Sequence, residues 1–283
     1  MSSALTNLIQ KVEGVHLLRR KAEVIAAPLL TEPVRFPYGP FRFRANIPRG
    51  LPYSVLASSD LINWLNIANG TSTGDAFEYV DSDASKSSYR FYRLLLDEVP
   101  SNNIVGYVSV FLPPGFSLIA NPLKSVSNSI ADLFRNWPNH TTLNKFDTRV
   151  FHMIENEVTG GRWTNPAQRL DPGEGAILHN PTSDFRNHNF VGEVLTSHAS
   201  VPIPSGFSLR STLLPQSGNL ADDLGFPIAN GDVIHLFDRD RQKYVLHSFD
   251  NDRWSPGPPI ISVGESFWVA KAEAGNWIKR LNS

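Results

Sequence analysis

The tetrapeptide GFSL occurs at residues 115–118 and again at 206–209, so its two copies lie 206 − 115 = 91 residues apart. The same offset, applied without a gap, aligns further identical pairs that are rich in Gly, Trp and Phe. These pairs include Phe146-Asp147 with Phe237-Asp238, Arg162-Trp163 with Arg253-Trp254, and Gly173-Glu174 with Gly264-Glu265. Identity of such residues at one fixed spacing indicates a tandem duplication. We therefore expect residues 106–195 and 196–283 to form two copies of one fold.

Each copy contains the same series of short apolar runs separated by turn residues. A GFSL strand is followed by a short predicted helix, which would begin at the N-cap residues Asn128 and Asn219. Two further strands in each copy are predicted to pair as a hairpin. In the first copy they are residues 142–147 and 149–155, and in the second they are residues 232–238 and 243–249. Strand-rich units of this kind with one small helix predict a small barrel or sandwich.

Residues 41–100 alternate strand patterns with clusters of turn residues. Alternation is clearest where Tyr89, Phe91 and Leu95 are interleaved with more polar neighbours, as in a strand with one buried face. The segment predicts a compact antiparallel β-module, and Ser101–Asn103 is interpreted as the linker that closes it. The five expected strands are 41–48, 53–59, 64–70, 77–82 and 89–96.

Residues 1–40 differ from the rest in charge and pattern. The first 50 residues hold eight Lys or Arg against three Glu, a balance of 8 − 3 = +5. Apolar side chains three or four residues apart predict a short N-terminal helix, followed by an extended basic arm. A lone helix needs a cover for its apolar face, either its own β-module or another copy of the chain. The residues expected to make this contact are Leu5, Leu8, Ile9, Val12, Arg19, Arg20 and Lys21.

Two stretches resemble known bacterial modules. The pattern GFSLIANPL, then a Phe-Asp strand end, Arg-Trp and LDPGEGAILHN resembles modules reading GWNLI-NPL … PGEGF. Such modules recur, often in pairs, in secreted or surface proteins of verrucomicrobial and planctomycete-like bacteria. The stretch from YSVLASSDLINWLNI to YRFYRLL resembles the immunoglobulin-like module of those proteins. The resemblance spans about residues 41–283. It implies an architecture and brings no catalytic residues.

Composition excludes several functional classes. The chain of 283 residues has no Cys, which excludes disulfides, thiolate metal sites and a cysteine nucleophile. A net charge of −1 argues against binding of nucleic acid by bulk electrostatics. The sequence shows neither a secretory signal pattern nor an apolar run of about 20 residues. We therefore expect no membrane span and assign no compartment.

Candidate metal ligands are weak. Asp238 with Asp240, and Asp250 with Asp252, crowd the two ends of the second predicted hairpin, where carboxylates could hold Ca²⁺. The alternative is that they are ordinary turn residues neutralised by neighbouring arginines. His235 and His247 could face each other across the same hairpin, and solvent-facing strand residues are the alternative.

Catalytic patterns are missing from the sequence. It has no GxSxG elbow, no HExxH and no phosphate-binding loop. Glu174 and Glu265 recur at one position of the duplicated fold, which favours a shared structural role over an acid–base pair. We predict a protein without cofactor and without enzymatic activity.

The tryptophans allow two interpretations. An indole at a strand end can stack on a sugar face, and Trp137, Trp163, Trp254, Trp268 and Trp277 are the candidates. The recurrence of Arg-Trp in both copies instead favours core indoles beside packed arginine stems. The residues expected to form the repeat core are Phe116, Trp163, Gly173, Phe207, Trp254 and Gly264.

The sequence thus predicts a mainly β protein with a short N-terminal helix, an immunoglobulin-like β-module and two homologous β-rich modules. The function it favours is non-catalytic: a structural or interaction protein that acts through its surfaces and binds itself or another protein. The alternative is a carbohydrate-binding protein.

Overall fold

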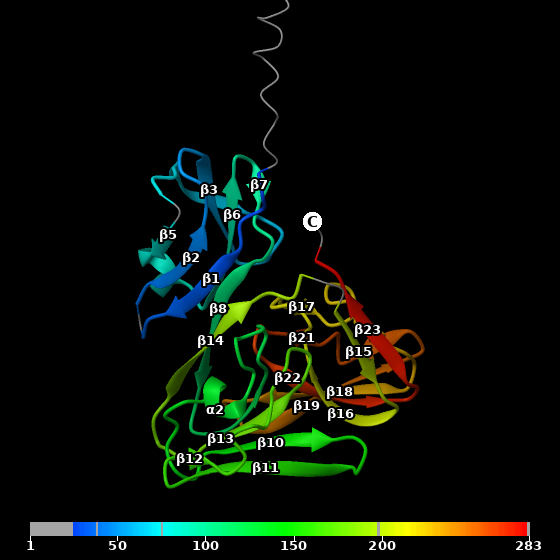
Figure 1. Ribbon diagram of the computed structural model, residues 1–283. Helices are drawn as coiled ribbons and strands as arrows, with labels where there is room; N and C mark the ends of the chain where they lie inside the picture. The colour runs from blue at the N-terminus through cyan, green and yellow to red at the C-terminus, as the bar shows by residue number, and fades with distance from the viewer. Residues whose placement is uncertain (1–24, 38, 75, 197–198, 282–283) are drawn as a thin grey trace, which may run out of the picture.

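The computed structural model describes residues 25–37, 39–74, 76–196 and 199–281. The chain is mainly β, and its sheets are antiparallel, which confirms the predicted fold class at this level. Figure 1 shows the amino-terminal strands above the two repeats. The residues expected to form an N-terminal contact, Leu5, Leu8, Ile9, Val12, Arg19, Arg20 and Lys21, lie outside the described residues.

The amino-terminal module consists of seven strands and one 3-10 turn. Two antiparallel sheets face each other in it, and the ring of Phe41 stacks on that of Tyr92 with a centroid distance of 4.7 Å. Its elements are β1 (Leu30–Arg35), β2 (Phe41–Asn46), β3 (Pro52–Ser58), β4 (Leu65–Thr71), β5 (Ala76–Asp81), the turn Ser82–Lys86, β6 (Tyr89–Leu96) and β7 (Val99–Pro100). The five predicted strands correspond to β2–β6.

The module is continuous with the first repeat. Strand β8 (Val105–Leu112) pairs with β6 and with β14 (Arg186–Glu193), so strands of both units share one sheet in the order β14-β8-β6-β3-β4. Ser101 and Asn103, expected in a linker, are buried. The Asn103 side chain accepts the N–H of Leu30 and donates to the carbonyl of Leu30, and these two hydrogen bonds hold β1 beside this sheet.

The two repeats build the same five-stranded sheet. The order β9-β13-β10-β11-β12 in the first matches β16-β22-β18-β19-β20 in the second. Every pairing within these sheets keeps the 91-residue offset; for example, Thr142 opposite His179 becomes Val233 opposite Ala270. The first set is β9 (Gly115–Ile119), β10 (Thr142–Asp147), β11 (His152–Thr159), β12 (Arg162–Trp163) and β13 (Ala176–Asn180). The second is β16 (Gly206–Ser211), β18 (Asp232–Asp238), β19 (Lys243–Asp250), β20 (Arg253–Ser255) and β22 (Ser266–Lys271).

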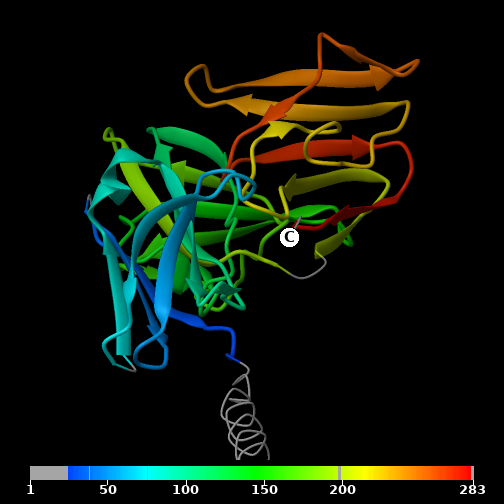
Figure 2. The same ribbon diagram turned by 90° about the horizontal axis from the view of Figure 1, so that it is seen from above.

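The remaining strands of the second repeat form two small sheets. Strand β15 (Ala199–Ile203) pairs with β23 (Gly275–Lys279), and β17 (Gly218–Asn219) pairs with β21 (Ile260–Ile261). Seen from above in Figure 2, the second repeat, yellow to red, lies on the far side of the green first repeat from the blue and cyan module.

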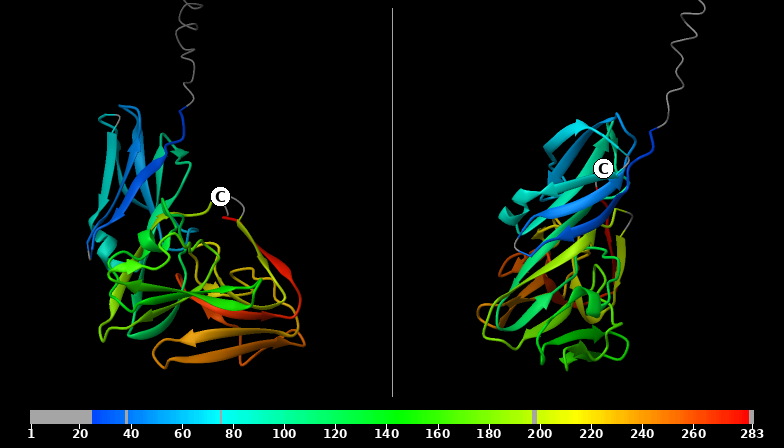
Figure 3. Two further views of the ribbon diagram at one scale, coloured as in Figure 1. Left: turned by 60° about the horizontal axis from the view of Figure 1, so that its bottom comes forward. Right: turned by 60° about the vertical axis from the view of Figure 1, so that its left-hand side comes forward.

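The two repeats contact each other through a pseudo-twofold interface. The N–H of Ala120 donates to the carbonyl of Gly264 at 3.0 Å, and the N–H of Ser211 donates to the carbonyl of Gly173 at 3.2 Å. These four residues are two pairs related by the 91-residue offset, so one contact is made twice. The left-hand view of Figure 3 shows the strands of the two repeats layered against each other.

Apolar side chains between the two sheets follow the same symmetry. Leu118 and Leu209 are buried there, and they occupy equivalent positions of β9 and β16. The other members of this inter-repeat cluster are two further equivalent pairs, Phe146 with Phe237 and Ile177 with Trp268. The interface is therefore a sheet-on-sheet contact, in which each repeat covers the apolar face that the other leaves exposed.

The predicted repeat helices are only partly present. The first is one turn, α2 (Ile130–Leu133), and its N-cap is Ser129, whose hydroxyl accepts the N–H of Asp132. The predicted cap Asn128 is instead buried and donates its amide to Asp171. In the second repeat, residues 220–224 form consecutive turns that end at Gly225, whose φ of 66° stops helical continuation.

Two residues assigned to the repeat core are surface residues. Phe116 and Phe207 are 46% and 40% exposed. In each strand the next residue, Ser117 or Ser208, is buried on the opposite face. Phe116 and Phe207 share a strand face with Leu118 and Leu209 and lie at the rim of the inter-repeat interface. Trp163 is buried and its Nε1–H donates to the carbonyl of Phe134, whereas Trp254 is half-buried against Phe249.

The interface generates a first prediction. Gly173 and Gly264 have φ values of 91° and 80°, and a Cβ on them would lie 2.9 Å from Val201 and 2.8 Å from Val110. We expect Gly173→Ala and Gly264→Ala each to lower the free energy of unfolding by about 2–4 kcal/mol, since backbone strain adds to overpacking. Denaturant unfolding measures this. Gly257→Ala, which meets no atom within 4 Å, is the control and should match the parent.

The burial difference between the two equivalent tryptophans generates a second prediction. Trp163→Ala should cost about 3–5 kcal/mol, as for other large buried side chains. Trp254→Ala should cost distinctly less, because its ring already contacts solvent. Thermal unfolding of both variants tests the difference, and equal losses would contradict the packing described for the two repeats.

Candidate functional site

An open pocket of about 290 Å³ lies where the two repeats meet. All six residues around it have aromatic rings, and both repeats contribute. The first repeat supplies Phe146 from β10 and Phe151 from the turn before β11. The second supplies Phe207, His235, Tyr244 and Trp268, one from each of β16, β18, β19 and β22. We call this set the aromatic pocket.

Four rings of the aromatic pocket form a closed circuit of nearly perpendicular neighbours. Phe146 lies 5.0 Å from Trp268 and 5.1 Å from Phe151, at interplanar angles of 73° and 79°. Phe207 closes the circuit at 6.5 Å from Trp268 and 6.4 Å from Phe151, at 78° and 71°. The four rings therefore form a continuous aromatic lining of the pocket.

The pocket offers little hydrogen bonding. The Nε1–H of Trp268 donates a hydrogen bond to the Tyr244 hydroxyl oxygen at 3.3 Å. Burial lowers the pKa of His235 below its usual value, which keeps its ring neutral at pH 7. Within the described part of the chain, no Asp, Glu, Lys or Arg lines the pocket.

The pseudo-symmetric position on the other side of the interface holds a different side chain. Phe151 corresponds to Gln242, since 151 + 91 = 242, and both have left-handed φ values, 52° and 51°. The Gln242 amide accepts the N–H of Phe116 and donates to its carbonyl, at 2.8 and 2.9 Å. Gln242 thus binds the backbone of Phe116, whose side chain remains exposed, whereas the equivalent Phe207 borders the aromatic pocket.

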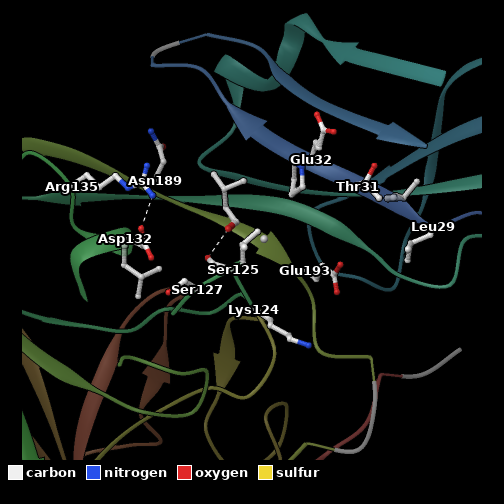
Figure 4. A pocket seen from close by; sticks show the side chains of 16 residues that line it. Leu29, Thr31, Glu32, Lys124, Ser125, Ser127, Asp132, Arg135, Asn189 and Glu193 are labelled. Atoms are coloured by element: carbon white, nitrogen blue, oxygen red, sulfur yellow. Dashed lines mark hydrogen bonds and ion pairs between the residues drawn. The ribbon is translucent and has the colours of Figure 1, made fainter. Parts of the chain in front are cut away.

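A larger groove of about 720 Å³ separates β1 from the first repeat (Figure 4). Several of its charged groups are engaged locally: Arg135 pairs with Asp132 at 2.6 Å, Glu32 pairs with Arg44 at 2.8 Å, and Glu193 accepts the amide of Asn103 at 3.0 Å. The Ser125 hydroxyl donates to the carbonyl of Val191. Because these groups serve the fold and do not converge on a common point, the groove is a weaker candidate than the aromatic pocket.

The tryptophans separate into two groups. Trp137, Trp163 and Trp277 are buried, which argues against a sugar platform at these three positions. A hollow of about 410 Å³ borders Trp137 and Trp163, but the Nε1–H of Trp163 is used internally. Of the five sugar-platform candidates, only Trp268 lies in the aromatic pocket.

Other predicted sites are not assembled. In the described residues, no group of three His, Asp or Glu side chains is placed to hold a metal ion. Asp238 accepts the N–H groups of Asp240 and Arg241 in a turn, and Asp250 and Asp252 lie at the opposite end of the hairpin. The expectation that His235 faces His247 is wrong. His235 is opposite Leu246, and His247 is opposite Ile234, so the imidazoles are on different faces.

Glu174 and Glu265 have equivalent places in the interface. Each accepts a backbone N–H three residues earlier, from Asp171 and Ser262 respectively. Glu174 also binds Lys145 at 2.8 Å, and burial raises the pKa of Glu265. The two carboxylates stabilise the same turn in the two repeats.

Three members of the pocket are not predicted from the sequence. Phe151 and Tyr244 are not among the candidate residues, and Phe146 is identified only as a position that the two repeats share. A usable signal lies in the aligned repeats. Phe151, His235, Tyr244 and Trp268 align with Gln242, Asn144, Met153 and Ile177 respectively. These four ring-bearing residues of the pocket therefore stand at positions where the other repeat has no aromatic ring.

A scan against protein-family models found no match, and a search of curated proteins found no similar sequence. No helix in the described ranges has the length and apolarity needed to cross a membrane.

A buried histidine provides a prediction independent of the pocket. His188 stacks on Phe134 at 4.6 Å, its Nε2 has no partner among the described residues, and burial lowers its pKa to about 3. Its counterpart by strand register is Trp277, because Val110 faces His188 and Val201 faces Trp277.

His188 should therefore make stability fall on acidification. Below pH 6.5 the unfolded chain takes up a proton that the folded chain rejects until about pH 3, so stability decreases through this window. We expect the parent to lose more stability than His188→Phe between pH 7 and pH 5, as followed by urea unfolding. Parallel pH profiles would contradict this assignment.

Proposed function

We propose that the protein is a non-catalytic binding protein whose aromatic pocket holds an apolar-faced group of its partner. The observation that carries the proposal is the gathering of six rings from both repeats around one open volume. Phe151, Phe207 and Tyr244 are 65%, 40% and 43% exposed, which is unusual for large rings that share one patch. Ligand sites are commonly apolar hollows of this size, and aromatic anchors dominate binding energy.

Carbohydrate binding is the second candidate. Half-exposed rings such as Trp268 and Tyr244 offer faces on which a sugar ring can stack. The lining contributes few hydrogen-bond groups, however, and sugar hydroxyls left without partners reduce affinity. We therefore rank this function below binding of an apolar or π-attracted group.

Assembly through residues 1–40 stays a separate proposal. Of this segment, residues 30–35 form β1, an edge strand paired with β2, so the basic arm is partly built into the module. The immunoglobulin-like nature of the module and the relation of the repeats to paired surface modules are also proposals. They are supported by two packed antiparallel sheets and by the equal strand registers.

A fluorescent apolar probe tests the proposed function. We expect N-phenyl-1-naphthylamine to bind the full chain at one site with increased emission. Phe207→Ala should weaken binding at least about ten-fold, because it removes one wall of the pocket.

The repeat supplies a matched control for this titration. Phe116 is the equivalent residue and is similarly exposed, so Phe116→Ala should bind the probe like the parent. Absence of saturable binding to the parent, or equal losses in the two variants, would reject the pocket as the binding site.

A further inference from the structure

We propose that the ligand group of the aromatic pocket is a quaternary ammonium, a nitrogen cation that carries only carbon substituents. This inference rests on the proposed function and specifies the chemistry that the same site recognises.

The arrangement of the rings supplies the attraction. A ring face is negatively polarised, and it attracts a cation that lies within about 6 Å of the ring centroid. Phe146, Phe151, Phe207 and Trp268 stand nearly perpendicular to their neighbours around the opening. A cation between perpendicular walls can contact several faces at once.

The shortage of polar partners selects among cations. An amine with N–H groups loses hydrogen bonds to water on entering the pocket, and the lining provides few replacements. The side-chain acceptors of the lining are the Tyr244 oxygen, which already receives the Trp268 N–H, and one nitrogen of the neutral His235. The lining includes no carboxylate from the described residues. A quaternary ammonium has no N–H to satisfy and is weakly hydrated, so it loses least on entry.

The difference between the two sides of the interface indicates that the opening is a built feature. Phe151 and the equivalent Gln242 share a left-handed backbone, with φ values of 52° and 51°, so the two sides differ in the side chain and not in the turn. At the equivalent position Gln242 fills the space against Gly115, where an added Cβ would lie 2.8 Å from its amide oxygen. An added Cβ at the equivalent Gly206 meets nothing within 4 Å. The space beside Gly115 is thus occupied by Gln242, whereas the space beside Gly206, next to Phe207, stays open.

Two ligands of equal shape test the inference. Choline and its neutral carbon isostere, 3,3-dimethyl-1-butanol, are titrated into the full chain by calorimetry or by tryptophan quenching. We expect choline to bind at least ten-fold more tightly. Phe207→Ala and Phe151→Gln should each weaken choline at least ten-fold. Both side chains are exposed, so the fold should be retained, as checked by the melting temperature.

The controls separate the inference from the proposed function. Phe116→Ala should bind choline like the parent, and a loss equal to that of Phe207→Ala would overturn the assignment. Equal affinity for the two isosteres, or no choline binding by a chain that still binds N-phenyl-1-naphthylamine, would overturn the ammonium specificity while the pocket remains a binding site. Failure of the naphthylamine probe itself would reject the proposed function.

Discussion

The paired backbone hydrogen bonds from Ala120 to Gly264 and from Ser211 to Gly173 position the two repeats, and the pocket depends on this position. Both glycines adopt positive φ and leave space for Val110 and Val201, which explains why Gly-Glu recurs in both copies. With the sheets held in this way, equivalent side chains from the two repeats meet between them. The interface works like a symmetric dimer contact within one chain.

The proposed binding site lies where the two repeats differ. A symmetric interface offers two identical rims. Here the Gln242 amide binds the Phe116 backbone at one rim, while aromatic rings surround an open pocket at the other. The symmetric contact can keep the fold stable while rim residues vary, because rim side chains contribute little to the buried core. The proposed binding site therefore results from a small number of aromatic residues on a duplicated scaffold.

Much of the architecture was predictable, because strand alternation and the 91-residue offset are local signals. The strands at 41–96, the two hairpins and the common register follow from them. The pocket was harder to predict because alternation shows which residues share a face, as with Phe116 and Leu118, but not what covers that face. Phe207 was assigned to the core for this reason. The pairing of β8 with β14, for example Val105 with Glu193, joins residues far apart in the sequence, and no local pattern reports it.

The central claim is that the two repeats pack face to face in this register, and a cysteine pair tests it directly. Glu174 and Arg210 are opposed as an antiparallel bridge between the repeats, and the neighbouring Ser211–Gly173 bond marks a non-hydrogen-bonded pair with Cα atoms about 4.5 Å apart. That spacing suits a disulfide, and the parent has no Cys to interfere. Oxidation of the Glu174→Cys, Arg210→Cys double variant should give a monomer with an intrachain disulfide and no free thiol. Two free thiols, or disulfides only between chains, would contradict the packing.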